Sequence, residues 1–194
     1  MHPGHPRFRR PAHGGEDPGK VSASGVKEKD INLAIAIKCQ RILEQNGIAT
    51  LLTRETDCSL EDAGVTNRKA SDLKNRKAMI TEKKPDCAVS IHQNSYPDTV
   101  QHGAQVFYPA ADTESERLAS LIQARIRYLT GQENKREIKP NSEYYLLRDN
   151  TVPTVIAEVC FLSNPSEAEM ITDETMQEKA AFAIAMGIMQ YLFS

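Results

Sequence analysis

The chain carries two decisive stretches, VSIHQNS at residues 89–95 and VIAEV at residues 155–159. In each, an apolar run typical of a buried strand ends at or contains an ionisable side chain, His92 in the first and Glu158 in the second. Burying an ionisable group costs free energy unless the group is paired or bound to a metal. These two positions are therefore the first candidates for a functional site.

A glycine-rich segment, HGGEDPG at residues 13–19, lies upstream and begins with His13. Paired glycines let a backbone approach a metal or substrate closely, although the same composition also suits a surface turn. Glu28 begins a predicted helix, where the helix dipole favours a carboxylate, and simple capping is the alternative there. Two histidines, a glutamate and a further carboxylate are what a hydrolytic zinc centre requires, so we group His13 and Glu28 with His92 and Glu158.

Alternative roles exist for the two strand residues. His92 is expected at the carboxyl end of its strand, where open α/β sheets bind their ligands, although a hydrogen-bonded structural histidine also fits. Asn94 and Ser95 continue a polar strand end, which is more typical of a site. Glu158, buried without a partner, would have a raised pKa and suits a general base. The alternative for Glu158 is a buried salt bridge with a base such as Arg148.

Composition sets broad limits. A chain of 194 residues and 21.6 kDa suits one domain, and 40% apolar with 26% charged residues is enough to build a core. The net charge of -2 gives no electrostatic case for binding nucleic acid or an anionic membrane. The four cysteines form no CxxC pair, and the apolar neighbours of Cys39 and Cys87 favour buried thiols over a disulfide framework.

The ends and apolar runs bear on localisation. No apolar run approaches the roughly 20 residues of a membrane span. Residues 1–10 are rich in Pro, His and Arg and are not a signal peptide as they stand, so a protein acting outside the cell would lack its export segment here. His2, His5 and His102 have no site-like neighbours and are interpreted as solvated.

Helix and strand patterns alternate along the chain. This alternation predicts an α/β fold, a single three-layer domain with a mainly parallel central sheet flanked by helices. Helical spacing of apolar residues predicts helices at 28–46, 67–83, from 113 up to a closing Gly131, and 175–192. Apolar runs predict strands at 48–53, 86–91, 104–108 and 154–159. Residues 56–66 are expected to be irregular, and 132–150 an exposed loop with a brief strand at 145–147.

Two local signals refine these helices. Thr113 and Glu116 have the spacing of a capping box, which would open the third helix. Gly187 lies in the apolar stripe of the last helix and indicates close packing with a neighbour.

Several motifs, taken in order along the chain, resemble the zinc-dependent N-acetylmuramoyl-L-alanine amidases of the type 3 family. They are HGGEDPG at 13–19, EKD at 28–30, LTR at 52–54, NR at 75–76, SIHQN at 90–94, GAQVFY at 103–108, and Glu158 with FLSNP at 161–165. The residues around His92 and the segment YYLLR at 144–148 are most similar to the germination-type amidases that spore-forming bacteria use on cortex peptidoglycan.

The resemblance implies an enzyme that hydrolyses the amide bond between N-acetylmuramic acid and L-alanine. It implies peptidoglycan as the partner molecule, action outside the cytoplasm in the cell wall or spore cortex, and leaves an activating protein partner open. Residues 13–194 are expected to form the catalytic domain, after an irregular tail at 1–12.

The resemblance also implies roles for individual residues. Three of them would bind one Zn2+: His13, Glu28 and His92. A water in the fourth position would have its pKa lowered to about 7, and Glu158 would accept its proton and return it to the leaving amine. Asn94 and Arg148 are expected to contact the substrate.

Two places depart from the family's pattern. The family's first strand is apolar, whereas residues 7–13 here are RFRRPAH, and arginines are hard to bury in a central parallel strand. We therefore expect residues 1–11 to be an irregular or edge segment, or the amino terminus not to be the natural one. Cys160 stands where the family usually has Gly, and its side chain is expected to crowd the site or tilt Glu158.

Two other functions fit the same residues. One is a catalytically impaired relative that binds peptidoglycan, as a damaged first strand would suggest, although all four candidate site residues are retained. The other is a zinc peptidase that cuts within the stem peptide. The masses of the products released from peptidoglycan distinguish the amidase from the peptidase.

Overall fold

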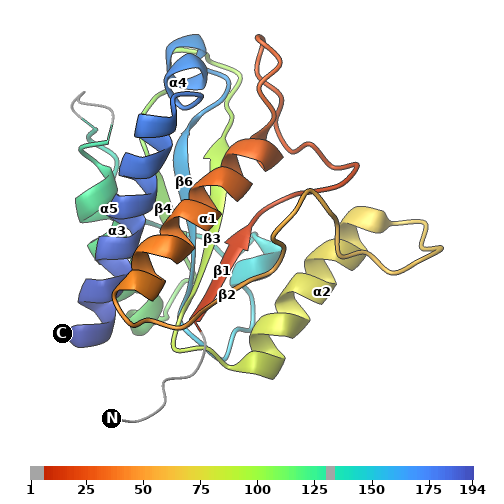
Figure 1. Ribbon diagram of the computed structural model, residues 1–194, viewed down its shortest axis with the longest axis vertical. Helices are drawn as coiled ribbons and strands as arrows, with labels where there is room; N and C mark the ends of the chain where they lie inside the picture. Colours follow the sequence, from red (N-terminus) through yellow and green to blue (C-terminus); the bar gives the residue numbers. More distant parts are fainter. Residues whose placement is uncertain (1–6, 130–133) are drawn as a thin grey trace.

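The computed structural model describes residues 7–129 and 134–194, in which strands and helices alternate along most of the chain (Figure 1). The strands are β1 (Arg7–Pro11), β2 (Thr50–Leu52), β3 (Ala88–Asn94), β4 (Gln105–Tyr108), β5 (Lys139–Pro140) and β6 (Thr154–Phe161). The helices are α1 (Glu28–Gln45), α2 (Arg68–Lys83), α3 (Thr113–Ile126), α4 (Pro165–Met170) and α5 (Glu174–Phe193), with a 3-10 turn η1 (Tyr145–Leu147).

The strands form one six-stranded sheet in the order β2-β1-β3-β6-β4-β5. The strands β2, β1, β3 and β6 are parallel, whereas β4 is antiparallel to β6 and parallel to β5. The main core joins the sheet to α1, α3 and α5 on one face, and smaller clusters join it to α2 and η1 on the other. This confirms the predicted three-layer α/β domain with a mainly parallel sheet.

The long helices match their predicted ranges closely, but the start of α3 differs in detail. Its N-cap is Asp112, whose side chain accepts hydrogen bonds from the backbone N–H groups of Glu114 and Ser115. The expected capping box at Thr113 is therefore wrong by one residue, because the carboxylate of Asp112 accepts the bonds from the exposed amides instead. Gly131, expected to close this helix, lies outside the described residues.

The sequence patterns did not predict three short elements. The expected strand at 145–147 is wrong, since these residues form η1, with Leu146 and Leu147 buried against the sheet. The elements β5 and α4 were not predicted, because two and six residues are too few to show a periodicity. Asn164 caps α4 by accepting hydrogen bonds from the N–H groups of Ser166 and Glu167.

The amino-terminal segment requires a larger correction. Residues 7–11 form β1, which lies between β2 and β3 and pairs with both in parallel. The expectation of an irregular or edge segment is therefore wrong for these residues, whereas residues 1–6 of the expected tail lie outside the described part. Strand pairing uses the backbone N–H and C=O groups, and every residue except proline has both. The backbone groups on the facing edges of β2 and β3 need hydrogen-bond partners, which β1 provides. The arginines in the sequence thus did not prevent pairing.

The described residues contain no helix with both the length and the apolar character needed to cross a membrane. Cys39 and Cys87 are buried free thiols, as predicted, and Cys160 is buried as well. His102 is exposed, as expected, while His2 and His5 lie outside the described residues.

Gly187 explains how closely α5 approaches α3. A methyl group at this position would lie 2.7 Å from the Cα atom of Ile122. We expect Gly187→Ala to lower the free energy of unfolding by about 1–3 kcal/mol through overpacking, although alanine usually favours a helix by about 1 kcal/mol over glycine. Urea unfolding checks this, and a variant more stable than the wild type would contradict the close packing.

Candidate metal centre

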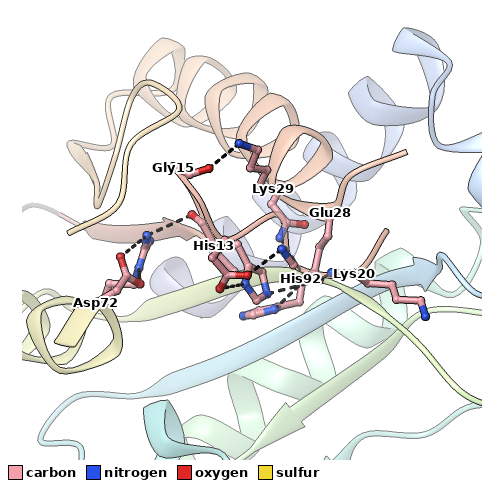
Figure 2. A network of polar contacts seen from close by, with 12 residues as sticks. His13, Gly15, Lys20, Glu28, Lys29, Asp72 and His92 are labelled. Atoms are coloured by element: carbon pink, nitrogen blue, oxygen red, sulfur yellow. Dashed lines mark hydrogen bonds and ion pairs between the residues drawn. The ribbon is translucent and has the colours of Figure 1, made fainter. Parts of the chain in front are cut away.

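Three side chains from distant parts of the chain meet at the carboxyl edge of the sheet (Figure 2). His13 follows β1, Glu28 is the first residue of α1, and His92 lies near the end of β3. Their candidate ligand atoms lie within 4.8 Å of one another. Glu28 Oε2 is 3.3 Å from His13 Nε2, and Glu28 Oε1 is 3.0 Å from His92 Nδ1. The structure therefore brings together the three residues predicted as metal ligands.

The donor set fits a zinc ion. Two imidazoles and one carboxylate are typical of catalytic zinc sites that keep a fourth position open. The Nδ1 atom of His13 lies 2.7 Å from Asp17 Oδ2, so that Nε2 is the atom turned toward Glu28. A carboxylate on the second nitrogen of a ligand histidine fixes its tautomer and orients its ring. The sequence pattern did not indicate this contact of Asp17, although Asp17 lies in the glycine-rich segment.

The backbone around His13 is held by two buried arginines. His13 has a φ of 59°, which is unusual for a residue with a side chain. Arg76 Nη2 donates a hydrogen bond to the carbonyl of His13 (3.1 Å), and Arg54 Nη2 donates to the carbonyl of Ala12 (3.2 Å). Arg54 also donates to the carbonyl of Lys29 on α1 (2.7 Å). These bonds tie the loop to the helix that carries Glu28 and stabilise the strained conformation.

Gly19 allows the backbone to pass directly beside the candidate ligands. Its φ is 65°, and a Cβ atom there would lie 2.6 Å from Glu28 Oε2 and 2.7 Å from His13 Cδ2. No larger residue fits without moving one of the two side chains. The paired glycines instead pass close to another loop, since a Cβ atom at Gly14 would lie 2.2 Å from the carbonyl oxygen of Cys58 and one at Gly15 would lie 2.9 Å from the hydroxyl of Ser59. Their approach to a metal or substrate stays a prediction.

Glu28 is buried and surrounded by donors. It accepts hydrogen bonds from the backbone N–H of Lys20 (2.8 Å), the backbone N–H of Gln93 (3.1 Å) and the side-chain amide of Asn32 (3.2 Å). Burial opposes its ionisation, but the hydrogen bonds and charges of the two histidines outweigh burial and hold the pKa of Glu28 far below its usual value. Glu28 is therefore a carboxylate, the form that binds a metal.

Glu158 stands beside this cluster in a different environment. It pairs in register with His92 across β3 and β6, and it is buried. Its Oε2 atom has no hydrogen-bond partner among the described residues. Burial and the negative charge of Glu28 raise the pKa of Glu158 well above its ordinary value. A carboxyl group with a raised pKa next to candidate metal ligands is the environment of a general base.

The alternative of a salt bridge between Glu158 and Arg148 finds no support. Arg148 is exposed, and its guanidinium donates to the carbonyls of Ser142 and Glu143 in its own loop. Asn94 lies at the end of β3, where its side chain accepts a hydrogen bond from the backbone N–H of Ser95. Substrate contact by Asn94 and Arg148 stays a prediction.

Cys160 does not crowd Glu158, contrary to expectation. Between the pairs His92–Glu158 and Asn94–Phe161, β6 advances by three residues while β3 advances by two, so β6 has a bulge. The extra residue turns the Cys160 side chain into the main core. There its Sγ atom donates a hydrogen bond to Gln93 Oε1 (3.0 Å). A bulge depends on pairing between strands and was not visible in the sequence.

We expect Glu158→Gln to stabilise the metal-free protein increasingly as pH rises. Because the pKa of Glu158 is raised in the folded state, the stability gained from its protonated form is present at low pH and is lost as pH rises through that pKa. A glutamine does not titrate and keeps its contribution. Urea unfolding of both proteins from about pH 5 to about pH 9 measures the difference, and a difference independent of pH would contradict the shifted pKa.

Comparison with known proteins agrees with this geometry. A family model described as N-acetylmuramoyl-L-alanine amidase matches residues 10–190. The germination-specific N-acetylmuramoyl-L-alanine amidase of Bacillus subtilis (strain 168) is 36% identical over 184 residues, covering 93% of this chain and 77% of the relative. The CwlD amidase from Clostridioides difficile, solved in complex with the GerS lipoprotein, has a TM-score of 0.93 and 40% identity, covering 97% of this chain and 98% of that one. The catalytic domain of CwlV, an amidase from Bacillus (Paenibacillus) polymyxa, has a TM-score of 0.83 and 32% identity, covering 95% and 96%. This chain therefore belongs to the N-acetylmuramoyl-L-alanine amidase family.

Proposed function

We propose that this chain is a zinc-dependent peptidoglycan hydrolase that cleaves the amide bond between N-acetylmuramic acid and L-alanine. The observation that carries the proposal is the convergence of His13, Glu28 and His92 within 4.8 Å, with the buried Glu158 in register beside His92. Membership of the amidase family supports this amide as the bond that is cleaved. The convergence of the three side chains supports zinc as the metal. Three protein ligands with an open position are typical of zinc enzymes that hydrolyse amides.

Each residue would have a distinct task. His13, Glu28 and His92 would hold the metal, which when bound lowers the pKa of water and polarises the scissile carbonyl. Asp17 would keep Nε2 of His13 directed at the ligand position through its 2.7 Å contact with Nδ1. Glu158, which has no hydrogen-bond partner for Oε2 among the described residues, would accept a proton from the attacking water and pass it to the leaving amine. Asn94 and Arg148 would contact the substrate.

We propose the setting of the reaction from the names of the relatives. The Bacillus subtilis relative is named germination-specific, and this supports cortex peptidoglycan as the substrate, outside the cytoplasm. The CwlD amidase was solved with a lipoprotein bound, which supports an accessory protein as a partner for this chain. An impaired, binding-only relative is less well supported, because β1 is intact and all four site residues converge.

The proposal predicts a specific product. Purified peptidoglycan treated with the zinc-loaded protein should release intact stem peptides with a free L-alanine amino group, and glycan chains that keep lactyl-bearing muramic acid. Removal of zinc with a chelator should abolish release, and added zinc should restore it. Mass spectrometry of the products decides. Cleavage within the stem peptide would identify a peptidase, and a protein that stays zinc-free after reconstitution would overturn the metal assignment.

Glu158→Gln separates a general base from a structural role. The variant keeps the shape of the side chain and the three candidate ligands, so zinc content should persist. Turnover should fall by roughly 10²–10⁴-fold, the usual effect of losing acid–base help. A variant that keeps near-normal specific activity would remove Glu158 from the mechanism. Thermal melting beside the assay guards against loss of activity by unfolding.

A further inference from the structure

A chain of buried side chains runs from the core to one oxygen of Glu28. The Sγ atom of Cys160 donates to Gln93 Oε1 (3.0 Å), Gln93 Nε2 donates to Asn32 Oδ1 (3.0 Å), and Asn32 Nδ2 donates to Glu28 Oε1 (3.2 Å). Cys160 and Asn32 are fully buried, and Gln93 is 3% exposed. This series of hydrogen-bonded side chains lies on the core side of the site and includes neither candidate histidine.

Chemistry determines which group donates and which accepts in each of these three hydrogen bonds. An ionised carboxylate can only accept hydrogen bonds, so Asn32 must present its NH₂ group to Glu28 and its carbonyl to Gln93. Gln93 must then present its NH₂ group to Asn32 and its carbonyl to Cys160. The last member must be a donor, and the thiol of Cys160 fills that position. Burial, with the charges of Glu167, Glu158 and Glu28, raises the pKa of Cys160 well above its ordinary value, which keeps the donor proton in place.

We propose that Cys160, Gln93 and Asn32 are positioning residues, which hold Oε1 of Glu28 in the orientation required of a metal ligand. This inference rests on the proposed function in treating Glu28 as a zinc ligand. A reversed Gln93 amide would turn its carbonyl toward Asn32, and a reversed Asn32 would turn a carbonyl toward the Glu28 carboxylate. The thiol disfavours both reversals, because its sulfur is a poor hydrogen-bond acceptor and would leave the NH₂ group of a reversed Gln93 poorly paired. Donors aimed at a ligand carboxylate also stabilise its charge before the metal arrives.

The test measures zinc affinity by competition with a fluorescent chelator. Asn32→Leu removes the donor that contacts Glu28 and should weaken zinc binding by roughly 10–100-fold. Gln93→Met keeps the backbone N–H bond to Glu28 and should weaken it less. Cys160→Ala should weaken it by about 3-fold, because the thiol acts through two further hydrogen bonds. Cys160→Ser restores a donor and should return the affinity to within about twofold of the wild type.

Cys87→Ala is the matched control, since it removes another buried thiol whose side chain contributes to the same main core. Equal zinc affinity in the wild type and in the variants at Asn32, Gln93 and Cys160 would overturn the proposal. So would a loss in Cys160→Ala that Cys87→Ala reproduces or that Cys160→Ser fails to rescue, because general destabilisation would then explain it. Melting temperatures of the metal-free proteins identify any variant that fails to fold.

A second readout keeps this test separate from the proposed function. In metal-free protein, NMR signals of the Asn32 side-chain amide should shift in Cys160→Ala and return in Cys160→Ser, because the chain transmits the change. Signals unchanged by Cys160→Ala would overturn the positioning role whatever the metal does. A wild type that binds no zinc would overturn the proposed metal centre, and the NMR result would still decide whether the thiol orders the amides beside Glu28.

Discussion

The site depends on one buried carboxylate and its donors. Glu28 is 4% exposed and lies between His13 and His92, where an unpaired charge would be too costly to bury. Its position at the start of α1 gives it the favourable end of a helix dipole. The hydrogen bond from the backbone N–H of Lys20 to Glu28 holds the loop after β1 against the start of the helix. The hydrogen bond from the backbone N–H of Gln93 to Glu28 holds the end of β3 beside the same carboxylate. The loop, helix and strand are thus arranged around a single charge.

The same edge of the sheet holds a second carboxyl group that is pushed in the opposite direction. Glu28 has donors on both oxygens and a lowered pKa, whereas Glu158 lies in an apolar setting with a raised pKa that the charge of Glu28 raises further. Two carboxyl groups with opposed shifts are the usual sign of a division of tasks in a hydrolase. One is suited to remain charged and bind a cation, and the other to gain and lose a proton. The contrast arises because hydrogen bonds and the charges of two histidines act on Glu28, whereas burial and the charge of Glu28 act on Glu158.

The sequence predicted which side chains lie together better than it predicted some of the strands that carry them. Glu158 stood out because a charge within an apolar strand needs a reason, and the order of motifs around His92 pointed to its partners. The first strand was misjudged, because side-chain composition was weighed above the need of β2 and β3 for backbone partners. The bulge at Cys160 and the contact between Asp17 and His13 depend on tertiary pairing. Single-sequence periodicity contains no information on either.

Costly features of this molecule gather at the edge where the metal would bind. His13 has a left-handed backbone, and Gly19 leaves no room for a side chain. Glu158 is buried, and its Oε2 atom has no hydrogen-bond partner in the described part of the chain. Each of these lowers stability if considered alone. The face of the sheet packed against α1, α3 and α5 is apolar and closely packed. Strain of this kind persists only where surrounding structure over-determines it. The core and the two buried arginines are therefore what hold the candidate ligands in this arrangement.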